Sequence, residues 1–164
     1  STGGWNPMTE ILVTGMKGGA GRTTVADSLR YVAGKENIPV EIVDGHGRLN
    51  CDLRARMSQA DYGIIVEEAS IFGRVDIGVT MGELRSRGIP CGAVINKWDL
   101  SEDEELLRFL EENGLPLLGR IPFNRYTALI LSEGKVLAEE MQDMYQLFLN
   151  MLRQITDSLE VGKQ

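Results

Sequence analysis

The chain has 164 residues, of which 43% are hydrophobic and 25% are charged. This composition excludes a disordered chain, and the length suits one domain with a hydrophobic core rather than two. The formal net charge of −7 argues against nucleic acid and membrane as general partners, since both favour a basic surface. The two cysteines lack a CxxC spacing, which excludes a disulfide framework, so we expect a reducing, cytoplasmic compartment.

Short apolar runs alternate with helical patterns along the chain. Residues 1–9 are small and polar, and we expect a disordered leader there, followed by a single domain over residues 10–164. Strands are predicted at 11–13, 40–44, 62–66, 92–96 and 115–121, and helices at 22–33, 50–59, 73–87, 101–113, 126–132 and 136–159. This alternation predicts a three-layer α/β fold, in which a mostly parallel sheet of about five strands has helices on both faces.

A glycine-rich segment joins the first predicted strand to the first predicted helix. Its sequence is Gly15-Met16-Lys17-Gly18-Gly19-Ala20-Gly21-Arg22-Thr23-Thr24. Glycines let consecutive backbone N–H groups converge on a phosphate at the positive end of a helix dipole, and a threonine hydroxyl there suits Mg²⁺. We therefore predict a phosphate-binding loop over this segment, with Thr23 as a Mg²⁺ ligand.

This loop resembles KGGxGK[ST][ST], the deviant Walker A motif of the MinD/ParA superfamily of dimeric P-loop ATPases. The resemblance implies a P-loop fold, ATP with Mg²⁺, and a homodimer in which Lys17 acts on the nucleotide of the partner subunit. It assigns nucleotide contacts to Gly18, Gly19, Ala20, Gly21, Arg22, Thr23 and Thr24. The superfamily normally has lysine at position 22 and the Walker motif has glycine at position 16. Arg22 and Met16 therefore predict weaker binding or slower hydrolysis, since a planar guanidinium is not equivalent to a compact ammonium.

The second predicted strand ends in Asp44-Gly45-His46-Gly47, which fits the DxxG pattern of a nucleotide switch. In such a switch the Asp holds Mg²⁺ through water and a glycine N–H senses the γ-phosphate. Asp44 is therefore a predicted catalytic and Mg²⁺ residue, and Gly47 a predicted nucleotide contact. A strand followed by an ordinary tight turn is the alternative. Nothing in the sequence pairs His46, the single histidine, with a nucleophile.

The spacing from Asp44 to Cys51, D-x-x-G-x-x-x-C, resembles the nitrogenase iron protein segment whose cysteine binds a cluster between two subunits. The resemblance raises an iron–sulfur cluster at Cys51 as an alternative. That cluster needs a second cysteine per subunit, and Cys91, which opens a distant strand, is a poor candidate. A buried or incidental thiol is the favoured interpretation of Cys51.

The fourth predicted strand ends in Asn96-Lys97-Trp98-Asp99, which fits NKxD. In Ras-like GTPases the Asp of this motif recognises guanine, whereas in the MinD/ParA group the corresponding Asn more often contacts adenine. The segments INKWDL and GLPLLGRIPFN resemble MinD-type ATPases with an inserted ferredoxin domain. We therefore expect ATP rather than GTP, with GTP as the alternative. The predicted nucleotide contacts here are Asn96, Lys97, Asp99, Pro122 and Phe123.

The resemblance covers most of residues 10–140 but leaves one element out. The superfamily has two Asp-bearing strands between the first helix and the segment at Ala60-Asp61, one with switch I and one with switch II. This chain has a single such strand, which makes it a minimal or degenerate member or an engineered deletion, without switch I or a ferredoxin insert.

Three functions follow. The first is an ATPase that switches a dimer or serves a metallocluster or redox partner, with slow turnover. The second is a module that binds nucleotide or a partner protein without turnover, and the third is a GTPase switch.

The predicted terminal helix has apolar side chains at helical spacing, from Leu137 to Leu159. Packing of this helix against the sheet is the simplest explanation of the pattern, and a surface that binds a partner is the second. Residues 153–164 lack a basic face, so we predict no membrane attachment.

Overall fold

The computed structural model describes residues 8–19, 21–45, 49–70, 73–98 and 104–162. Within them, five parallel strands form one sheet in the order β2-β1-β3-β4-β5. The strands are β1 (Thr9–Thr14), β2 (Val40–Asp44), β3 (Tyr62–Glu68), β4 (Cys91–Trp98) and β5 (Leu117–Pro122). The predicted α/β fold is confirmed. β1 begins at Thr9, inside the segment predicted as a leader, whose residues 1–7 lie outside the described residues.

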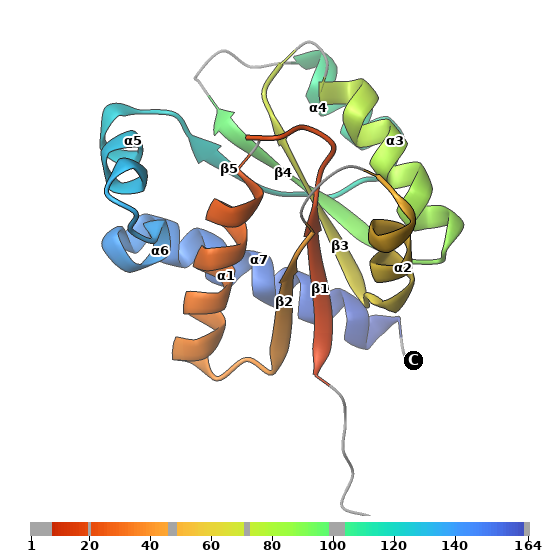
Figure 1. The fold of residues 1–164 in the computed structure, drawn as a ribbon, viewed down its shortest axis with the longest axis horizontal. Coiled ribbons are helices and arrows are strands. Elements are labelled where there is room, and N and C mark those ends of the chain that lie inside the picture. The colour runs from red at the N-terminus through yellow and green to blue at the C-terminus, as the bar shows by residue number, and fades with distance from the viewer. Residues whose placement is uncertain (1–7, 20, 46–48, 71–72, 99–103, 163–164) are drawn as a thin grey trace, which may run out of the picture.

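Helices cover both faces of the sheet (Figure 1). α1 (Arg22–Glu36), α5 (Arg125–Ser132), α6 (Leu137–Glu140) and α7 (Gln142–Val161) lie on one face, and α2 (Cys51–Gln59), α3 (Gly73–Ser86) and α4 (Glu104–Glu112) lie on the other. Alternate residues of β1 serve the two layers, because Ile11 and Val13 pack with α1 and α7 whereas Leu12 packs with α2 and α3. A parallel sheet buried on both faces explains the continuous apolar runs of the strands.

The order of the strands reverses beside β1. From β1 the chain passes through α1 to β2 at one edge, whereas β3 lies on the other side of β1 and leads outward to β4 and β5. In open α/β sheets, ligands bind at the carboxyl ends of the strands where the order reverses. The loop after β1 and the ends of β2, β3 and β4 meet at this point. β2 is an edge strand of the described sheet.

The C-terminal helical segment differs from the prediction of one helix over residues 136–159. It consists of α6 and α7, separated at Met141, whose backbone is extended with φ −131° and ψ 120°. Leu137 and Ala138 are buried in the same layer as α1, and the Ala138 N–H donates to Ser28 Oγ of α1 at 3.3 Å, whereas Phe148 packs with the sheet. Burying both segments requires a change of direction, so packing overrides the helical pattern. None of the described helices, α7 included, is long and apolar enough to cross a membrane.

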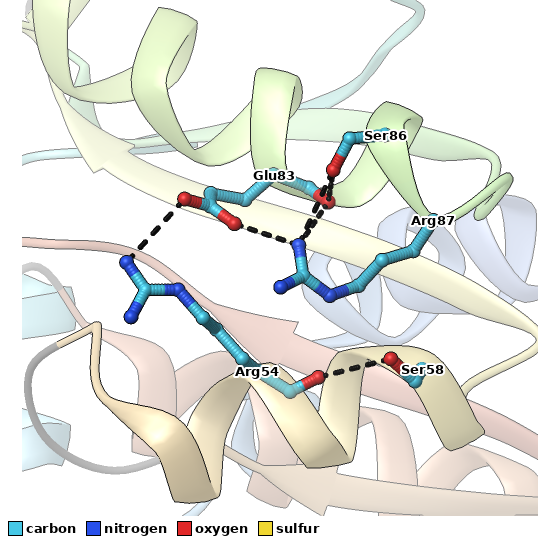
Figure 2. A network of polar contacts seen from close by, with 5 residues as sticks. All are labelled: Arg54, Ser58, Glu83, Ser86 and Arg87. Carbon is cyan, nitrogen blue, oxygen red and sulfur yellow. Dashed lines mark hydrogen bonds and ion pairs between the residues drawn. The ribbon is translucent and has the colours of Figure 1, made fainter.

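A polar network joins α2 to α3 on the second face of the sheet (Figure 2). Glu83 of α3 lies between two arginines: it accepts from Arg87 Nη1 at 2.6 Å and pairs with Arg54 Nη2 of α2 at 3.5 Å. The hydrogen bond from Arg87 holds the pKa of Glu83 below its ordinary value. These hydrogen bonds and ion pairs link α2, the helix that follows β2 in the chain, to α3 in the same layer.

Candidate nucleotide-binding site

The glycine-rich loop runs from the end of β1 to the start of α1. Gly19, with φ 80°, and Gly21, with φ 100°, have the left-handed backbone in which a side chain is strained. Gly21 is the N-cap of α1 and has no side chain to cap the helix. The N–H groups of the first turn therefore point out of the helix toward the loop, as anion binding requires. Ala20 lies outside the described residues.

Two glycines let the loop approach the neighbouring strands closely. A Cβ on Gly15 would overlap the carbonyl oxygen of Val66 in β3, and a Cβ on Gly21 would overlap Nδ2 of Asn96 in β4. At Gly18, by contrast, no atom lies within 4 Å of the position that a Cβ would take. The loop is therefore packed against the sheet at Gly15 and Gly21 and open at Gly18.

The structure brings together the two residues predicted to hold Mg²⁺. Thr23 Oγ1, in the first turn of α1, donates to Asp44 Oδ2, at the end of β2, at 2.7 Å. Hydroxyl and carboxylate oxygens are ligands that Mg²⁺ prefers, so this donor set fits the ion. The described residues hold no cluster of three or more His, Cys, Asp or Glu side chains that could bind a metal by itself. Gly47 and His46 lie outside the described residues.

Arg22 makes a contact that sequence analysis missed. Its Nη1 donates to the carbonyl oxygen of Gly15 at 2.8 Å and to that of Gly45 at 3.1 Å. The guanidinium thus joins the start of the loop to the residue that follows β2. Sequence analysis assigned Arg22 a phosphate contact only. Because a guanidinium carries several N–H donors, further hydrogen-bond partners could have been expected for it. Thr24 follows on α1 and is half-buried.

Two lysines that were predicted as site residues both contact the carboxylate of Glu68, which sequence analysis did not select. Lys17 Nζ lies 3.5 Å from Glu68 Oε2, and Lys97 Nζ lies 2.8 Å from Glu68 Oε1. The hydrogen bond from Lys97 holds the pKa of Glu68 below its ordinary value. Lys97 has φ 53°, a strained backbone for a lysine, at the end of β4. Glu68 ends β3 at the carboxyl edge of the sheet, and this position was the signal that could have found it.

Glu67, the residue before Glu68, is buried, and sequence analysis did not select it either. Only 1% of the residue is exposed. Its Oε1 accepts from the N–H of Glu68 at 3.1 Å, and its Oε2 is among the buried side-chain oxygens of the described chain that have no hydrogen-bond partner. Burial raises the pKa of Glu67 to about 7, so its protonation changes near neutral pH.

A cavity of about 140 Å³ lies beside the loop, between the ends of β4 and β5 and helices α5 and α6. Four of the five residues predicted around NKxD line it, and the fifth, Asp99, lies outside the described residues. The four are Asn96, Lys97, Pro122 and Phe123. Asn96 also packs on Gly21, which connects the cavity to the phosphate loop. An apolar slot with one amide and one ammonium suits an aromatic base.

The two free cysteines lie at opposite edges of the sheet. Cys51 begins α2, which follows the carboxyl end of β2, and Cys91 begins β4 at the amino edge. They cannot ligate one cluster within a subunit. Cys51 is exposed, so the interpretation of this residue as a buried thiol is wrong, because Leu53 and Met57 carry the buried face of α2.

No protein-family model matches the chain, and no curated protein matches it. Solved structures do match. MinD of Pyrococcus horikoshii in complex with Mg-ADP aligns over 90% of this chain and 95% of its own, with a TM-score of 0.70 and 15% identity. MinD of Pyrococcus furiosus, a cell division ATPase, aligns over 91% and 98%, with a TM-score of 0.73 and 14% identity. An ATP complex of a Cyanothece McdA variant aligns over 94% and 97%, with a TM-score of 0.69 and 14% identity.

The chain has the MinD/ParA-type P-loop fold. This confirms the fold that the loop sequence implied. At 14–15% identity the likeness establishes the fold, and the roles of individual residues rest on the contacts described above.

Proposed function

We propose that this chain binds ATP with Mg²⁺ in the loop of residues 15–24 and hydrolyses it slowly. The Thr23–Asp44 hydrogen bond of 2.7 Å, beside a loop with two left-handed glycines, is the observation that carries the proposal. A hydroxyl and a carboxylate at the open end of a helix form the donor set that Mg²⁺ and a phosphate chain require together. The P. horikoshii MinD structure contains Mg-ADP and the McdA structure contains ATP, which supports the assignment.

Each part of the nucleotide has its own residues in this proposal. Backbone N–H groups from Gly18 to Thr24 bind the phosphates, and Arg22 adds positive charge beside them. Thr23 ligates Mg²⁺ directly and Asp44 through water. The ion neutralises negative charge on the phosphate oxygens when it is bound. The cavity beside Asn96 and Lys97, with Pro122 and Phe123 at its wall, receives the base.

Slow turnover follows from what surrounds Asp44. Hydrolysis needs a group that positions water on the γ-phosphate, and in the resembled superfamily an Asp of the switch I strand does this. β2 is an edge strand of the described sheet, so none of the described strands flanks it on its outer side. A module that binds nucleotide without turnover is therefore the second candidate.

Calorimetry with ATP, ADP and GTP, each with Mg²⁺, tests the binding. We expect ATP to bind more tightly than GTP, and Asn96→Ala to weaken ATP binding about tenfold, the effect of losing one buried hydrogen-bonding partner. Asn150→Ala, an exposed position on α7, is the matched control and leaves the affinity unchanged. A chain that binds none of the three nucleotides contradicts the proposal. Phosphate release then measures turnover.

The proposal includes a nucleotide-favoured homodimer with the phosphate loops face to face, in which Lys17 crosses to the nucleotide of the partner. Such an interface is isologous, so a substitution acts twice. Lys17→Ala should weaken dimerisation with a non-hydrolysable ATP analogue more than it weakens ATP binding. Sedimentation with and without the analogue measures this. A monomer under saturating analogue rejects the crossing role and favours the binding module. The resemblance to MinD-type ATPases with a ferredoxin domain adds a metallocluster or redox protein as the expected target.

A further inference from the structure

The edge strand β2 has one row of backbone groups toward β1 and another toward the outside of the sheet. β2 lies at one edge of the described sheet, beside α1 (Figure 1), and pairs with β1. The N–H of Gly45, directly after β2, donates to the carbonyl oxygen of Val13 in β1 at 2.8 Å. Successive residues of a strand point their backbone groups to opposite sides, so every second residue before Gly45 also faces β1. The N–H and carbonyl groups of Val40, Ile42 and Asp44 therefore point to the outer edge.

Arg30 of α1 covers the middle of this outer edge. It donates from Nε and Nη2 to the carbonyl oxygen of Ile42, at 3.2 and 3.0 Å. Its Nη1 pairs with Asp27 Oδ1, one turn earlier on α1, at 3.3 Å, which holds the guanidinium from its other side. A carbonyl oxygen has two lone pairs, so the two arginine donors occupy both. The N–H of an added strand would donate to this same oxygen, since the backbone groups of an edge strand are the template for strand pairing.

The sequence of β2 does not itself oppose pairing with a second copy. It reads Val-Glu-Ile-Val-Asp and contains neither lysine nor proline, the residues that commonly protect an edge strand. In an antiparallel pair centred on Ile42, Ile42 lies opposite Ile42 of the second copy. Val40 then lies opposite Asp44, and Glu41 lies opposite Val43. No two acidic residues face each other directly, so charge repulsion between opposite residues does not prevent this pair.

We propose that Arg30 closes the edge of β2 against pairing with β2 of a second copy of this chain. The guanidinium occupies the central carbonyl oxygen of the outer row, and a second strand can use this oxygen only after the guanidinium leaves it. Loss of the guanidinium gives a dimer in which two β2 strands pair antiparallel across a two-fold axis, an isologous contact. The inference goes beyond the proposed function and does not depend on nucleotide binding.

Arg30→Met tests the proposal, because it removes the guanidinium and keeps an unbranched apolar stem. Sedimentation velocity is measured without nucleotide, so that a nucleotide-favoured dimer does not contribute. We expect the dimer dissociation constant of Arg30→Met to lie at least about tenfold below that of the wild type.

Amide hydrogen exchange, measured by NMR, locates the contact. The Ile42 amide of Arg30→Met should exchange about tenfold more slowly in a concentrated sample than in a dilute one. The Val43 amide, which faces β1, should exchange at the same rate in both samples.

Lys35→Met is the matched control. It removes the same positive charge from the same helix, at a side chain that lies over the ring of Tyr31, 5.7 Å from its centroid. The variant should remain monomeric at concentrations at which Arg30→Met is a dimer. Arg30→Lys keeps a charged N–H donor at the edge and should also remain monomeric.

Two results would overturn the proposal in the variant. One is a folded Arg30→Met protein that stays monomeric, and the other is a dimer in which the Ile42 amide gains no protection. The wild type supplies a test that needs no variant to fold. Its Ile42 amide should exchange at rates within about twofold of each other in the dilute and concentrated samples. Protection of this amide that grows with concentration would show that the edge pairs despite Arg30, and the proposal would be wrong.

Discussion

Replacing Glu67 by Gln should remove a pH dependence of stability that the structure attributes to this residue. Glu67 is 1% exposed, and burial, with a smaller contribution from the negative charge of Asp76, raises its pKa from 4.5 to about 7. Between these two values the folded chain holds a proton that the unfolded chain has released, so the free energy of unfolding falls as pH rises. The difference between 4.5 and about 7 corresponds to roughly 3 kcal/mol, of which about 2.5 kcal/mol is lost between pH 5 and pH 8.

Urea unfolding of the wild type and of Glu67→Gln at pH 5, 6, 7 and 8 measures the effect. The wild type should lose about 2 to 3 kcal/mol relative to the variant across this range, and the loss should level off above pH 7. Glu112→Gln, at an exposed position on α4, is the control and should follow the wild type. If the free energy of unfolding changes with pH in the same way in the wild type and in Glu67→Gln, the carboxyl group of Glu67 is ionised in the folded chain. The reasoning from burial would then be wrong.

Three further predictions concern the site. Gly21→Ala should destabilise the fold by about 2 kcal/mol or more in thermal unfolding, because φ is 100° and the new Cβ overlaps Asn96, whereas Gly18→Ala should lie within about 1 kcal/mol of the wild type. Thr23→Val should weaken ATP binding about tenfold with Mg²⁺ and leave binding in EDTA unchanged, as titration calorimetry can measure. Asp44→Asn should show the same Mg²⁺-dependent loss, and equal losses with and without Mg²⁺ would remove both residues from the metal site.

The parts of the site that depend on local sequence could be predicted, and the parts that depend on strand order could not. The position of the glycine-rich loop could be predicted because left-handed turns need glycine at fixed positions along the chain, and Gly19 and Gly21 have φ 80° and 100°. The contact of Asn96 with Gly21 requires β4 to lie near the end of β1, and no sequence pattern gives the order of strands. Sequence analysis missed Glu68 because, in the sequence, an acidic residue at the end of a strand looks the same as one whose side chain is simply exposed to solvent. Met141 breaks the last helical segment without glycine or proline, so only packing could reveal the break.

The Lys17–Glu68 pair bears on whether the proposed dimer can form. Lys17 is 48% exposed and 3.5 Å from Glu68, and an ion pair this exposed is worth about 1 kcal/mol or less. A charge-assisted hydrogen bond to a phosphate contributes roughly 1.5 to 3 kcal/mol, so exchanging the intramolecular partner for a partner subunit's nucleotide is favourable. Glu68 does not lose its charge compensation in this exchange, because Lys97 lies only 2.8 Å from its other oxygen. Because two lysines contact one carboxylate, Lys17 can move away from Glu68 at a small cost in free energy. A single lysine–glutamate pair at this position would not allow this.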